Sequence, residues 1–331
     1  MRVGVVGATG AVGRELVDVL GRRAFPMTSL RLFASARSAG TKLKTPLGET
    51  AIEEFSDAAM RDLDLALLAV SGDFAKAHAP QMVEAGVFVV DNSSAFRLQD
   101  NVPLVVPEVN AAAINGSKLI ANPNCTTAIL VVALEPLRQA FGLKRVIVST
   151  YQAASGAGAE GMQELERESR RVLVEGEKAR ADVFRWPLAF NVIPQIDSFQ
   201  PNGYTREEMK VTWESRKIMG CPDLPISCTA VRIPTMRVHA EAVTIETERP
   251  VTPEAARDVL RRARGVKVMD DPENGIYPMP LTATGQDDVE AGRIRANPVF
   301  GEFGLDFFLC GDQLLKGAAL NAVQIAERLK A

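Results

Sequence analysis

The stretch "RVGVVGATGAVGRELVDVL", which starts at Arg2, restricts the fold of this chain more than any other feature. It predicts a short buried strand, a turn with glycines at positions 7, 10 and 13, and an amphipathic helix. Glycine turns also occur without a ligand. Between a strand and a helix, however, they let the backbone approach a pyrophosphate, which the N–H groups and dipole at the start of the helix favour. The chain is therefore expected to begin with a Rossmann-like dinucleotide-binding domain.

The second predicted strand, residues 30 to 34, ends in a segment that bears on the choice of cofactor. An NAD site usually presents an acidic residue to the ribose here, roughly 20 residues beyond the glycine turn. This chain has Ser35, Arg37 and Ser38 instead. Hydroxyl and guanidinium groups suit a 2′-phosphate, although a polar surface turn is the alternative. Together with the glycine turn, the segment favours NADP over NAD and leaves the degree of preference open.

Further apolar runs predict that this domain contains a parallel sheet. They cover residues 63 to 70, 87 to 92, 104 to 110 and 118 to 122, and helical or loop segments separate them. Ligands of open α/β sheets bind at the carboxyl ends of the strands. Arg97, which follows the second of these runs, is therefore a candidate anion ligand, or else an ordinary solvated arginine.

Composition excludes several classes of protein. The 331 residues are 47% hydrophobic and 24% charged, which allows two domains with cores of their own. Apolar runs stay well below the ~18 residues of a membrane span, and no leader pattern follows Met1, so a cytoplasmic location is expected. A net charge of −3 without long basic runs argues against nucleic-acid binding. Four scattered cysteines and two histidines make a metal site improbable.

The segment "NPNCTTAILVVAL", which starts at Asn122, contains a candidate nucleophile. If Asn124 caps a helix here, Cys125 lies in its first turn, where the dipole and unpaired N–H groups stabilise a thiolate. The same N–H groups would stabilise an oxyanion after attack on a carbonyl. Pro136 is expected to kink or end this helix. The alternative is a buried cysteine that only fills space.

Other candidate site residues lie further along the chain. His239 is the stronger candidate proton-transfer partner of the two histidines, and "AVRIPTMRVHAEAVTIE" predicts a strand pair in which Arg232 and His239 flank a site across a turn. Gln152 follows an apolar strand and could orient a substrate carbonyl or a neighbouring side chain. Glu207 and Lys210 share one face of a predicted helix at a spacing of i, i+3, where a surface ion pair is the alternative.

Together the segments "GATGAVGRE", "ASARSAG", "NPNCTT", "QAASGAG", "RIPTMRVHAE" and "GDQLLKGAALNAVQIAE" resemble the aspartate-β-semialdehyde dehydrogenase family over almost the whole chain, in the same order. The resemblance implies NADPH-dependent reduction of 4-phospho-L-aspartate to L-aspartate 4-semialdehyde and phosphate. It also implies a cysteine acyl-thioester intermediate. This reaction leads toward lysine, through diaminopimelate, and toward methionine and threonine.

The resemblance also implies a role for each site residue. Cys125 would be the nucleophile, His239 the acid/base for the thiol and hemithioacetal protons, Gln152 the group that positions the acyl carbon, and Asn124 a support for the nucleophile. Substrate and phosphate would be bound by Arg232 at the carboxylate, by Glu207 at the amino group with Glu208 as its alternative, and by Arg97 and Lys210 at the phosphate. The expected cofactor contacts are Gly7, Thr9, Gly10, Ala11, Val12, Gly13, Ser35, Arg37, Ser38, Ser155, Gly156 and Gln313.

The expected architecture is an NADP-binding domain over residues 1–122 and an α+β catalytic and dimerisation domain over residues 123–312. The C-terminal helix within 313–331 carries an apolar stripe, with Asp312 as its cap, and is expected to pack back on the first domain. The family likeness further suggests a homodimer or homotetramer.

Two other functions remain as alternatives. One is N-acetyl-γ-glutamyl-phosphate reductase, which Glu207 disfavours because that substrate has no free amine to meet a carboxylate. The other is a non-catalytic NADPH-binding redox sensor, which would not need Arg232, Lys210 and His239 around the thiol. The roles of Cys221, Cys228 and Cys310 stay open.

Overall fold

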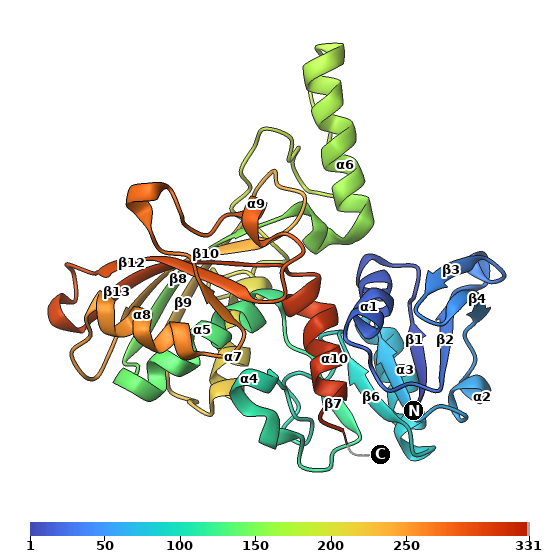
Figure 1. The fold of residues 1–331 in the computed structure, drawn as a ribbon. Helices are drawn as coiled ribbons and strands as arrows, with labels where there is room; N and C mark the ends of the chain where they lie inside the picture. The colour runs from blue at the N-terminus through green and yellow to red at the C-terminus, as the bar shows by residue number, and fades with distance from the viewer. Residues whose placement is uncertain (330–331) are drawn as a thin grey trace. The chain divides into compact units, whose positions relative to one another are not determined.

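The computed structural model describes residues 1–329. The chain divides into two units, Met1–Asn124 with Gly317–Ala331, and Cys125–Lys316. The boundary therefore falls directly between Asn124 and Cys125. Each unit is built on its own sheet (Figure 1).

The first unit contains a seven-stranded sheet in the order β3-β4-β2-β1-β5-β6-β7. All neighbouring strands pair in parallel except β3 and β4, which form an antiparallel pair. The central strands have buried apolar side chains on both faces, as expected when helices cover both sides of a parallel sheet. The strands are β1 (Arg2–Val6), β2 (Ser29–Ala34), β3 (Lys42–Thr45), β4 (Gly48–Glu54), β5 (Leu65–Leu68), β6 (Phe88–Asp91) and β7 (Leu119–Ala121).

Most helical segments of the first unit lie between its strands in the sequence, whereas the last one comes from the C-terminal part of the chain. The helical segments of this unit are α1 (Ala11–Arg22), η1 (Ala36–Ser38), α2 (Asp57–Met60), α3 (Gly72–Glu84), α4 (Pro107–Asn110), η2 (Ala111–Ile114) and α10 (Leu320–Ala326). Helix α10 contacts α1, α4 and β6, so the prediction that the C-terminal helix packs on the first domain is confirmed. Its asparagine Asn321 is fully buried and donates to Val105 O and Asn122 Oδ1.

The second unit contains a six-stranded mixed sheet in the order β11-β12-β13-β10-β8-β9. Strands β8 and β9 are parallel, while β10 runs antiparallel to both β8 and β13. The strands are β8 (Arg145–Gln152), β9 (Ile226–Arg232), β10 (His239–Glu246), β11 (Val266–Val268), β12 (Val289–Ala296) and β13 (Gly304–Gly311).

Helices α5, α7 and α8 pack against this sheet and against one another (Figure 1). The helical segments are α5 (Cys125–Phe141), η3 (Ala154–Ala157), α6 (Gly158–Arg170), η4 (Arg171–Glu175), α7 (Arg206–Met219), α8 (Pro253–Arg262), η5 (Pro272–Asn274), α9 (Pro280–Ala283), η6 (Gly301–Phe303) and η7 (Leu315–Ala319), which spans the unit boundary. None of the helices within residues 1–329 is long and apolar enough to cross a bilayer.

Two sequence predictions of local structure were wrong, and one alternative of a third is excluded. Residues 104–110 do not form a strand: Leu104 makes one parallel bridge to Ala121, and α4 begins at Pro107. Pro136 was predicted to kink or end α5; the helix continues to Phe141, so the proline does not end it, and the kink stays a prediction. Strands β9 and β10 are not paired, because β8 lies between them. Proline at the first position of α4 is favourable because its missing N–H has no partner there in any helix.

Candidate active site

The glycine turn of the first unit has the close backbone approaches of a dinucleotide cradle. Gly7 adopts φ +85°, and a Cβ there would lie 2.2 Å from Ala69 O. A Cβ on Gly13 would lie 2.1 Å from Gly7 O, so α1 starts tightly against the turn. The N-cap residue Gly10 makes no side-chain cap hydrogen bond. The first N–H groups of α1 are thus not capped by that residue, as an anion site requires.

The remaining predicted cofactor residues of this unit surround the same sheet edge. Ser35 and Arg37 are exposed in and before η1, directly after β2, the parallel neighbour of β1. No acidic residue stands in this turn, so the residues fit a phosphate better than a ribose diol. Thr9, Gly10, Ala11, Val12 and Ser38 are also in the glycine turn or η1.

Arg97 is not a solvated surface arginine. Its side chain is buried, Nε donates to Asn122 O at 2.8 Å, and Nη2 donates to Asn92 O at 2.8 Å. Asn122 Nδ2 donates in turn to Asn92 Oδ1 at 2.9 Å. This amide network fixes the guanidinium at the carboxyl end of β6, where the sequence predicted an anion ligand.

Cys125 is the first residue of α5 and is partly exposed. One turn further along, Ile129 packs so closely on the sheet that a Cβ on Gly311 would lie 2.6 Å from it. Gly311 is the register partner of His239. The start of α5 is therefore held against the end of the sheet that carries His239.

Three predicted residues lie in one row across that end of the sheet. Gln152 and Arg232 are register partners and the last residues of the parallel strands β8 and β9. His239 is the first residue of the neighbouring antiparallel strand β10. All three side chains are buried. A Cβ on Gly156 would lie 2.5 Å from Arg232 Nη1 and 3.3 Å from His239 Cε1, so these groups converge on that glycine.

His239 is held as a neutral donor. Its Nδ1 accepts the backbone N–H of Ala153 at 3.1 Å, so the proton of the neutral ring resides on Nε2. Burial, followed by the positive charge of Arg232, lowers the pKa of His239 to about 3. Its Nε2 has no hydrogen-bond partner among the described residues. The ring therefore presents an N–H donor near neutral pH.

Arg232 supplies the positive charge of the row. Nη1 donates to Ala153 O at 2.7 Å, and the guanidinium lies 5.8 Å from the ring centroid of Phe184. Burial lowers the pKa of Arg232, whereas the neighbouring Glu207 and Cys125 raise it. An arginine stays protonated despite such shifts. Cys125 thus has two thiolate-stabilising features nearby, a helix start and a buried cation.

Glu207 and Lys210 face this row from α7. Glu207 Oε1 accepts Gln152 Nε2 at 3.2 Å, and Oε2 accepts Lys210 Nζ at 3.1 Å. Gln152 Oε1 accepts the hydroxyl of Thr150 at 3.0 Å, so its amide is oriented from both sides. Glu208, the alternative to Glu207, is engaged elsewhere: it closes a capping box with Thr205 and accepts the N–H of Ala230 at 2.9 Å.

Ser155 and Gln313, the other predicted cofactor residues, are hydrogen-bonded to each other, with Gln313 Nε2 as donor. Gln313 Oε1 also accepts the N–H of Val238 at 2.8 Å. Val238 has φ +77°, which is a strained conformation for a β-branched residue. Gln313 thus fixes the unusual turn that leads into His239.

Comparisons with known proteins show the family of this chain. The family model "Semialdehyde dehydrogenase, NAD binding domain" matches residues 2–117, and "Semialdehyde dehydrogenase, dimerisation domain" matches residues 134–316. An aspartate-semialdehyde dehydrogenase of a Synechocystis strain is 48% identical over 99% of this chain and 97% of its own length. The chain belongs to the aspartate-semialdehyde dehydrogenase family.

Solved structures of the aspartate-semialdehyde dehydrogenase family share the fold. Aspartate semialdehyde dehydrogenase II from Vibrio cholerae, complexed with ASA, matches with a TM-score of 0.94 and 40% identity, over 99% of this chain and 97% of that one. The enzyme from Candida albicans, solved with NADP, matches with a TM-score of 0.75 and 25% identity, over 100% of this chain and 98% of that one.

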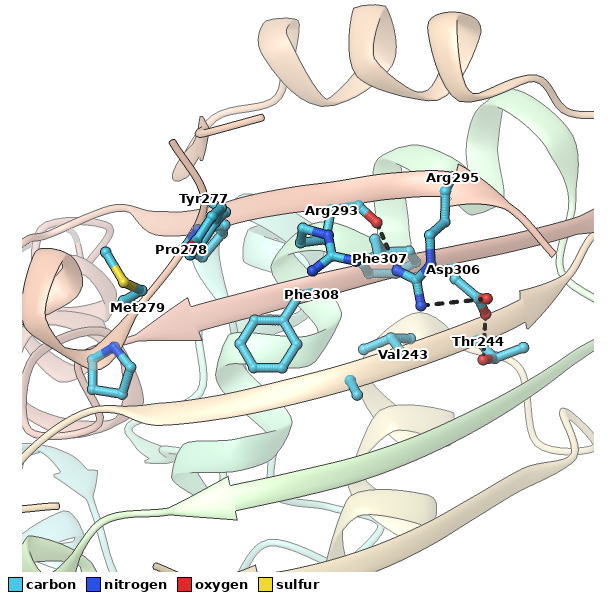
Figure 2. A pocket seen from close by; sticks show the side chains of 12 residues that line it. Val243, Thr244, Tyr277, Pro278, Met279, Arg293, Arg295, Asp306, Phe307 and Phe308 are labelled. Carbon is cyan, nitrogen blue, oxygen red and sulfur yellow. Dashed lines mark hydrogen bonds and ion pairs between the residues drawn. The ribbon is translucent and has the colours of Figure 1, made fainter. Parts of the chain in front are cut away.

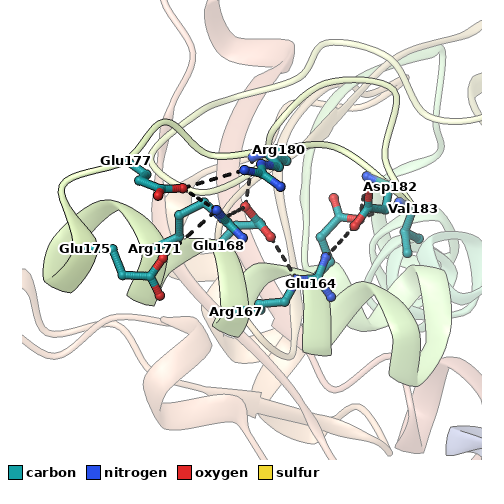
Figure 3. A network of polar contacts seen from close by, with 9 residues as sticks. All are labelled: Glu164, Arg167, Glu168, Arg171, Glu175, Glu177, Arg180, Asp182 and Val183. Carbon is teal, nitrogen blue, oxygen red and sulfur yellow. Dashed lines mark hydrogen bonds and ion pairs between the residues drawn. The ribbon is translucent and has the colours of Figure 1, made fainter.

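Sequence reasoning about this member of the aspartate-semialdehyde dehydrogenase family missed Phe184 and Asp197. Both belong to the segment between η4 and α7, which has no regular periodicity. Buried Glu168 and Glu164 of α6 accept backbone N–H groups of Arg180 and Asp182 at 2.8 and 2.9 Å, and so hold the start of this segment (Figure 3). Ile193 then pairs with the end of β9 through two backbone hydrogen bonds with Arg232, at 3.0 and 2.9 Å.

Proposed function

We propose that this protein is an aspartate-semialdehyde dehydrogenase, which reduces 4-phospho-L-aspartate with NADPH to L-aspartate 4-semialdehyde and phosphate. This reaction belongs to lysine, methionine and threonine biosynthesis. A catalytic thiol requires a reducing environment, and all four cysteines are free, so we assign the enzyme to the cytoplasm.

The observation that carries the proposal is the set of charges around Gln152. Arg232 offers a guanidinium for the substrate carboxylate, and Glu207, hydrogen-bonded to Gln152, offers a carboxylate for its ammonium group. Lys210, at 3.1 Å from Glu207, is the proposed phosphate ligand of this unit. Arg97, which belongs to the other unit, stays a predicted phosphate ligand. An α-amino acid that carries an acyl phosphate has a carboxylate, an ammonium group and a phosphate, which match these side chains.

NADPH supplies the hydride. The glycine turn and the segment Ser35–Ser38 fit the pyrophosphate and the 2′-phosphate, as described above. Ser155, Gly156 and Gln313 remain the proposed cofactor contacts of the second unit.

The proposed chemistry uses Cys125 and His239. The Cys125 thiolate attacks the acyl carbon, and phosphate leaves with the electron pair of the broken C–O bond, which forms a thioester. Hydride addition to the thioester gives a hemithioacetal oxyanion. His239 donates a hydrogen bond from Nε2–H to that oxyanion, and the oxyanion then re-forms the C=O bond as the C–S bond breaks, which releases the aldehyde and the Cys125 thiolate. Because Nδ1 is occupied and Nε2 carries a proton, His239 is a donor rather than the base for the thiol.

Glu207 also distinguishes this function from N-acetyl-γ-glutamyl-phosphate reductase. An acetylated amine is neutral and offers no partner to a buried carboxylate. Glu207 would keep Lys210 as a cationic partner, but the acetylated substrate would lack the charge-assisted hydrogen bond that an ammonium makes with this carboxylate. A redox sensor needs neither this carboxylate nor a proton donor at His239.

The proposed function is tested in the reverse direction. Purified protein receives aspartate semialdehyde, phosphate and NADP, and NADPH formation is followed by absorbance. Turnover should require phosphate and should be lost in Cys125→Ala, while Cys221→Ala, which alters the other partly exposed cysteine, should keep it. Equal turnover of N-acetylglutamate semialdehyde would overturn the substrate assignment.

We further propose that the chain forms a homodimer through the uncovered face of the second sheet. A hollow of about 440 Å³ lies on this face, lined by Phe308, Thr244 and Tyr277 among others. Figure 2 shows these side chains. Partly exposed side chains alternate with buried ones in the middle of β10 and β13, so the helices of this unit leave part of this face uncovered, while α9 packs against one end of it. A half-apolar face of this kind is typical of subunit interfaces.

A further inference from the structure

Asp197 has an unusual backbone conformation. Its φ of +68° lies in the left-handed region, which non-glycine residues rarely adopt and which aspartate tolerates better than most. Its Oδ1 accepts the N–H of Ser198 at 2.8 Å, which fixes the side chain in the turn. The other oxygen, Oδ2, is thereby directed toward α7, where it accepts Lys210 Nζ at 2.9 Å.

Lys210 is consequently held between two carboxylates. Its ammonium donates to Asp197 Oδ2 at 2.9 Å and to Glu207 Oε2 at 3.1 Å, and its side chain is 17% exposed. Burial alone lowers the pKa of Lys210, but the two carboxylates raise it overall, so the group stays an ammonium. An ammonium has three N–H donors, and these two contacts use two of them. One donor remains for an incoming anion.

The two carboxylates have different tasks. Glu207 also accepts a hydrogen bond from Gln152 and lies near Arg232, so it belongs to the row that faces the substrate. Within the described residues, no hydrogen bond joins Asp197 to Gln152. Asp197 is linked to the row through its hydrogen bond with Lys210. Without Asp197, Glu207 would be the remaining anionic partner of the ammonium. Lys210 would then neutralise the carboxylate that the substrate amine requires.

We propose that Asp197 is a positioning residue that shares the Lys210 ammonium with Glu207, so that Lys210 can bind phosphate while Glu207 keeps enough negative charge to bind the substrate ammonium. This inference rests on the proposed function. It explains why the chain maintains a left-handed aspartate at this position. An ion pair without function would not require a strained backbone conformation beside the site.

The test uses Asp197→Gly and Asp197→Asn in the full-length enzyme. Glycine adopts positive φ without strain and removes the carboxylate, while asparagine tolerates the same conformation and removes the charge alone. Phosphate is varied at saturating aspartate semialdehyde and NADP. Both variants should raise the KM for phosphate about tenfold, as expected for loss of one charge-assisted hydrogen bond, and should leave kcat within about threefold. The KM for aspartate semialdehyde should rise as well.

Two controls separate positioning from a general structural effect. Phe190→Gly makes the same change at another positive-φ residue of this segment, whose side chain is 62% exposed, and should leave both KM values unchanged. In a Lys210→Met background, Asp197→Gly should have no further effect on phosphate. The inference is overturned if Asp197→Gly leaves the KM for phosphate unchanged. It is also overturned if Asp197→Gly raises this KM as much in the Lys210→Met background as in the wild type.

A binding measurement separates this inference from the proposed function. Inorganic phosphate is titrated into the NADP-loaded wild type and Asp197→Gly, with heat of binding as the readout. If the wild type turns over and Asp197→Gly binds phosphate as tightly as the wild type, the inference is rejected and the proposed function stands. Absence of turnover rejects the proposed function, and tighter phosphate binding by the wild type than by the variant would still support the Asp197–Lys210 arrangement. Absence of both turnover and phosphate binding by the wild type rejects both.

Discussion

The Nδ1 atom of His239 accepts a hydrogen bond from the backbone N–H of Ala153, at 3.1 Å. A backbone amide cannot act as the acceptor in this pair, so the bond is compatible with the neutral ring and is lost if Nδ1 is protonated. Burial and Arg232 disfavour the imidazolium as well. His239 therefore enters the reaction with one proton, on the nitrogen that has no partner within the described residues.

The first prediction is that the His239 ring does not titrate between pH 5 and pH 8, because its pKa is lowered to about 3. The chain has two histidines, so the variant His78→Gln leaves a single set of imidazole signals. The Cε1–H chemical shift of His239 should stay constant over this range in the NMR spectrum. A shift with a midpoint near 6.5 would show that the ring is protonated in the folded state and would reject the assigned tautomer.

The second prediction concerns the thiolate of Cys125. Its pKa should rise in Arg232→Leu, because the buried guanidinium that interacts with it is removed while the helix start remains. The rate of alkylation by iodoacetamide at pH 7 should fall about tenfold, which corresponds to about one pKa unit.

The measurement is made in a Cys221→Ser background. Cys228 and Cys310 are buried, and burial, followed by nearby carboxylates, raises the pKa of both thiols. Alkylation in this background therefore reports on Cys125. An alkylation rate that is unaffected by Arg232→Leu would mean that the helix start alone sets the reactivity.

The sequence predictions that were confirmed depend on contacts between residues that are close in the chain. Gly7 and Gly13 are required by contacts within one strand–turn–helix unit, so their pattern can be read directly. The end of β8 at Gln152 and the start of β10 at His239 likewise coincide with local features, a glycine-rich turn and a preceding proline-containing turn.

What sequence reasoning missed depends on pairing between distant segments. The strand between Arg232 and His239 is β8, about 80 residues earlier in the chain, and no local pattern encodes its insertion. The contact between Asp197 and Lys210 likewise needs a left-handed turn that aspartate tolerates without requiring it. Pro136 does not end α5, because burial of the neighbouring apolar side chains, at about 1.5–3 kcal/mol for each large one, offsets the ~3 kcal/mol cost of a helical proline.

The third prediction concerns the segment that carries Phe184 and Asp197. Glu168 accepts the N–H of Arg180 at 2.8 Å and pairs with Arg167 and Arg171 (Figure 3). The Arg180 N–H and then Arg167 lower the pKa of Glu168, so its charge stabilises this attachment near neutral pH. Glu168→Gln should increase the rate of tryptic cleavage at Arg180 and Arg185 about tenfold. Glu166→Gln, on the same helix but exposed, is the control and should have no effect.

The fourth prediction tests the proposed dimer. Light scattering should give the wild type twice the 35.7 kDa chain mass. Phe308→Asp places a charge on the uncovered sheet face, and the two-fold symmetry of a homodimer would bury two such charges, at several kcal/mol each. This variant should be monomeric. Leu47→Asp, which changes an apolar side chain of the first unit that is 55% exposed, should stay dimeric. A Phe308→Asp dimer would move the interface to another surface.

The fifth prediction concerns Glu241, two residues after His239 on the same face of β10. Its side chain is fully buried, and neither carboxyl oxygen has a hydrogen-bond partner among the described residues. Burial raises the pKa of Glu241 well above 4.5, so the folded protein keeps it protonated at pH values where the unfolded chain has lost the proton. Stability is therefore lost as pH rises above about 4.5, by about 1.4 kcal/mol per pH unit until the folded pKa is reached.

His239 has the opposite effect on the same strand. Its folded pKa is lowered from 6.5 to about 3, so the unfolded chain binds the extra proton and stability is lost as pH falls below 6.5. Between about pH 4.5 and 6.5 the two slopes, each about 1.4 kcal/mol per unit, cancel. Above pH 6.5 the Glu241 slope remains.

Glu241→Gln should consequently become more stable relative to the wild type as pH rises from 6 to 8, and His239→Asn should become more stable relative to the wild type as pH falls from 6.5 to 5. Urea unfolding at fixed protein concentration measures the free energy of unfolding of each variant at each pH. The double variant lacks both titrating groups, so its stability should show neither of the two pH slopes. If Glu241→Gln differed from the wild type by the same amount at pH 6 and pH 8, the carboxyl would not be held protonated, and a partner for it would have to exist in the folded protein.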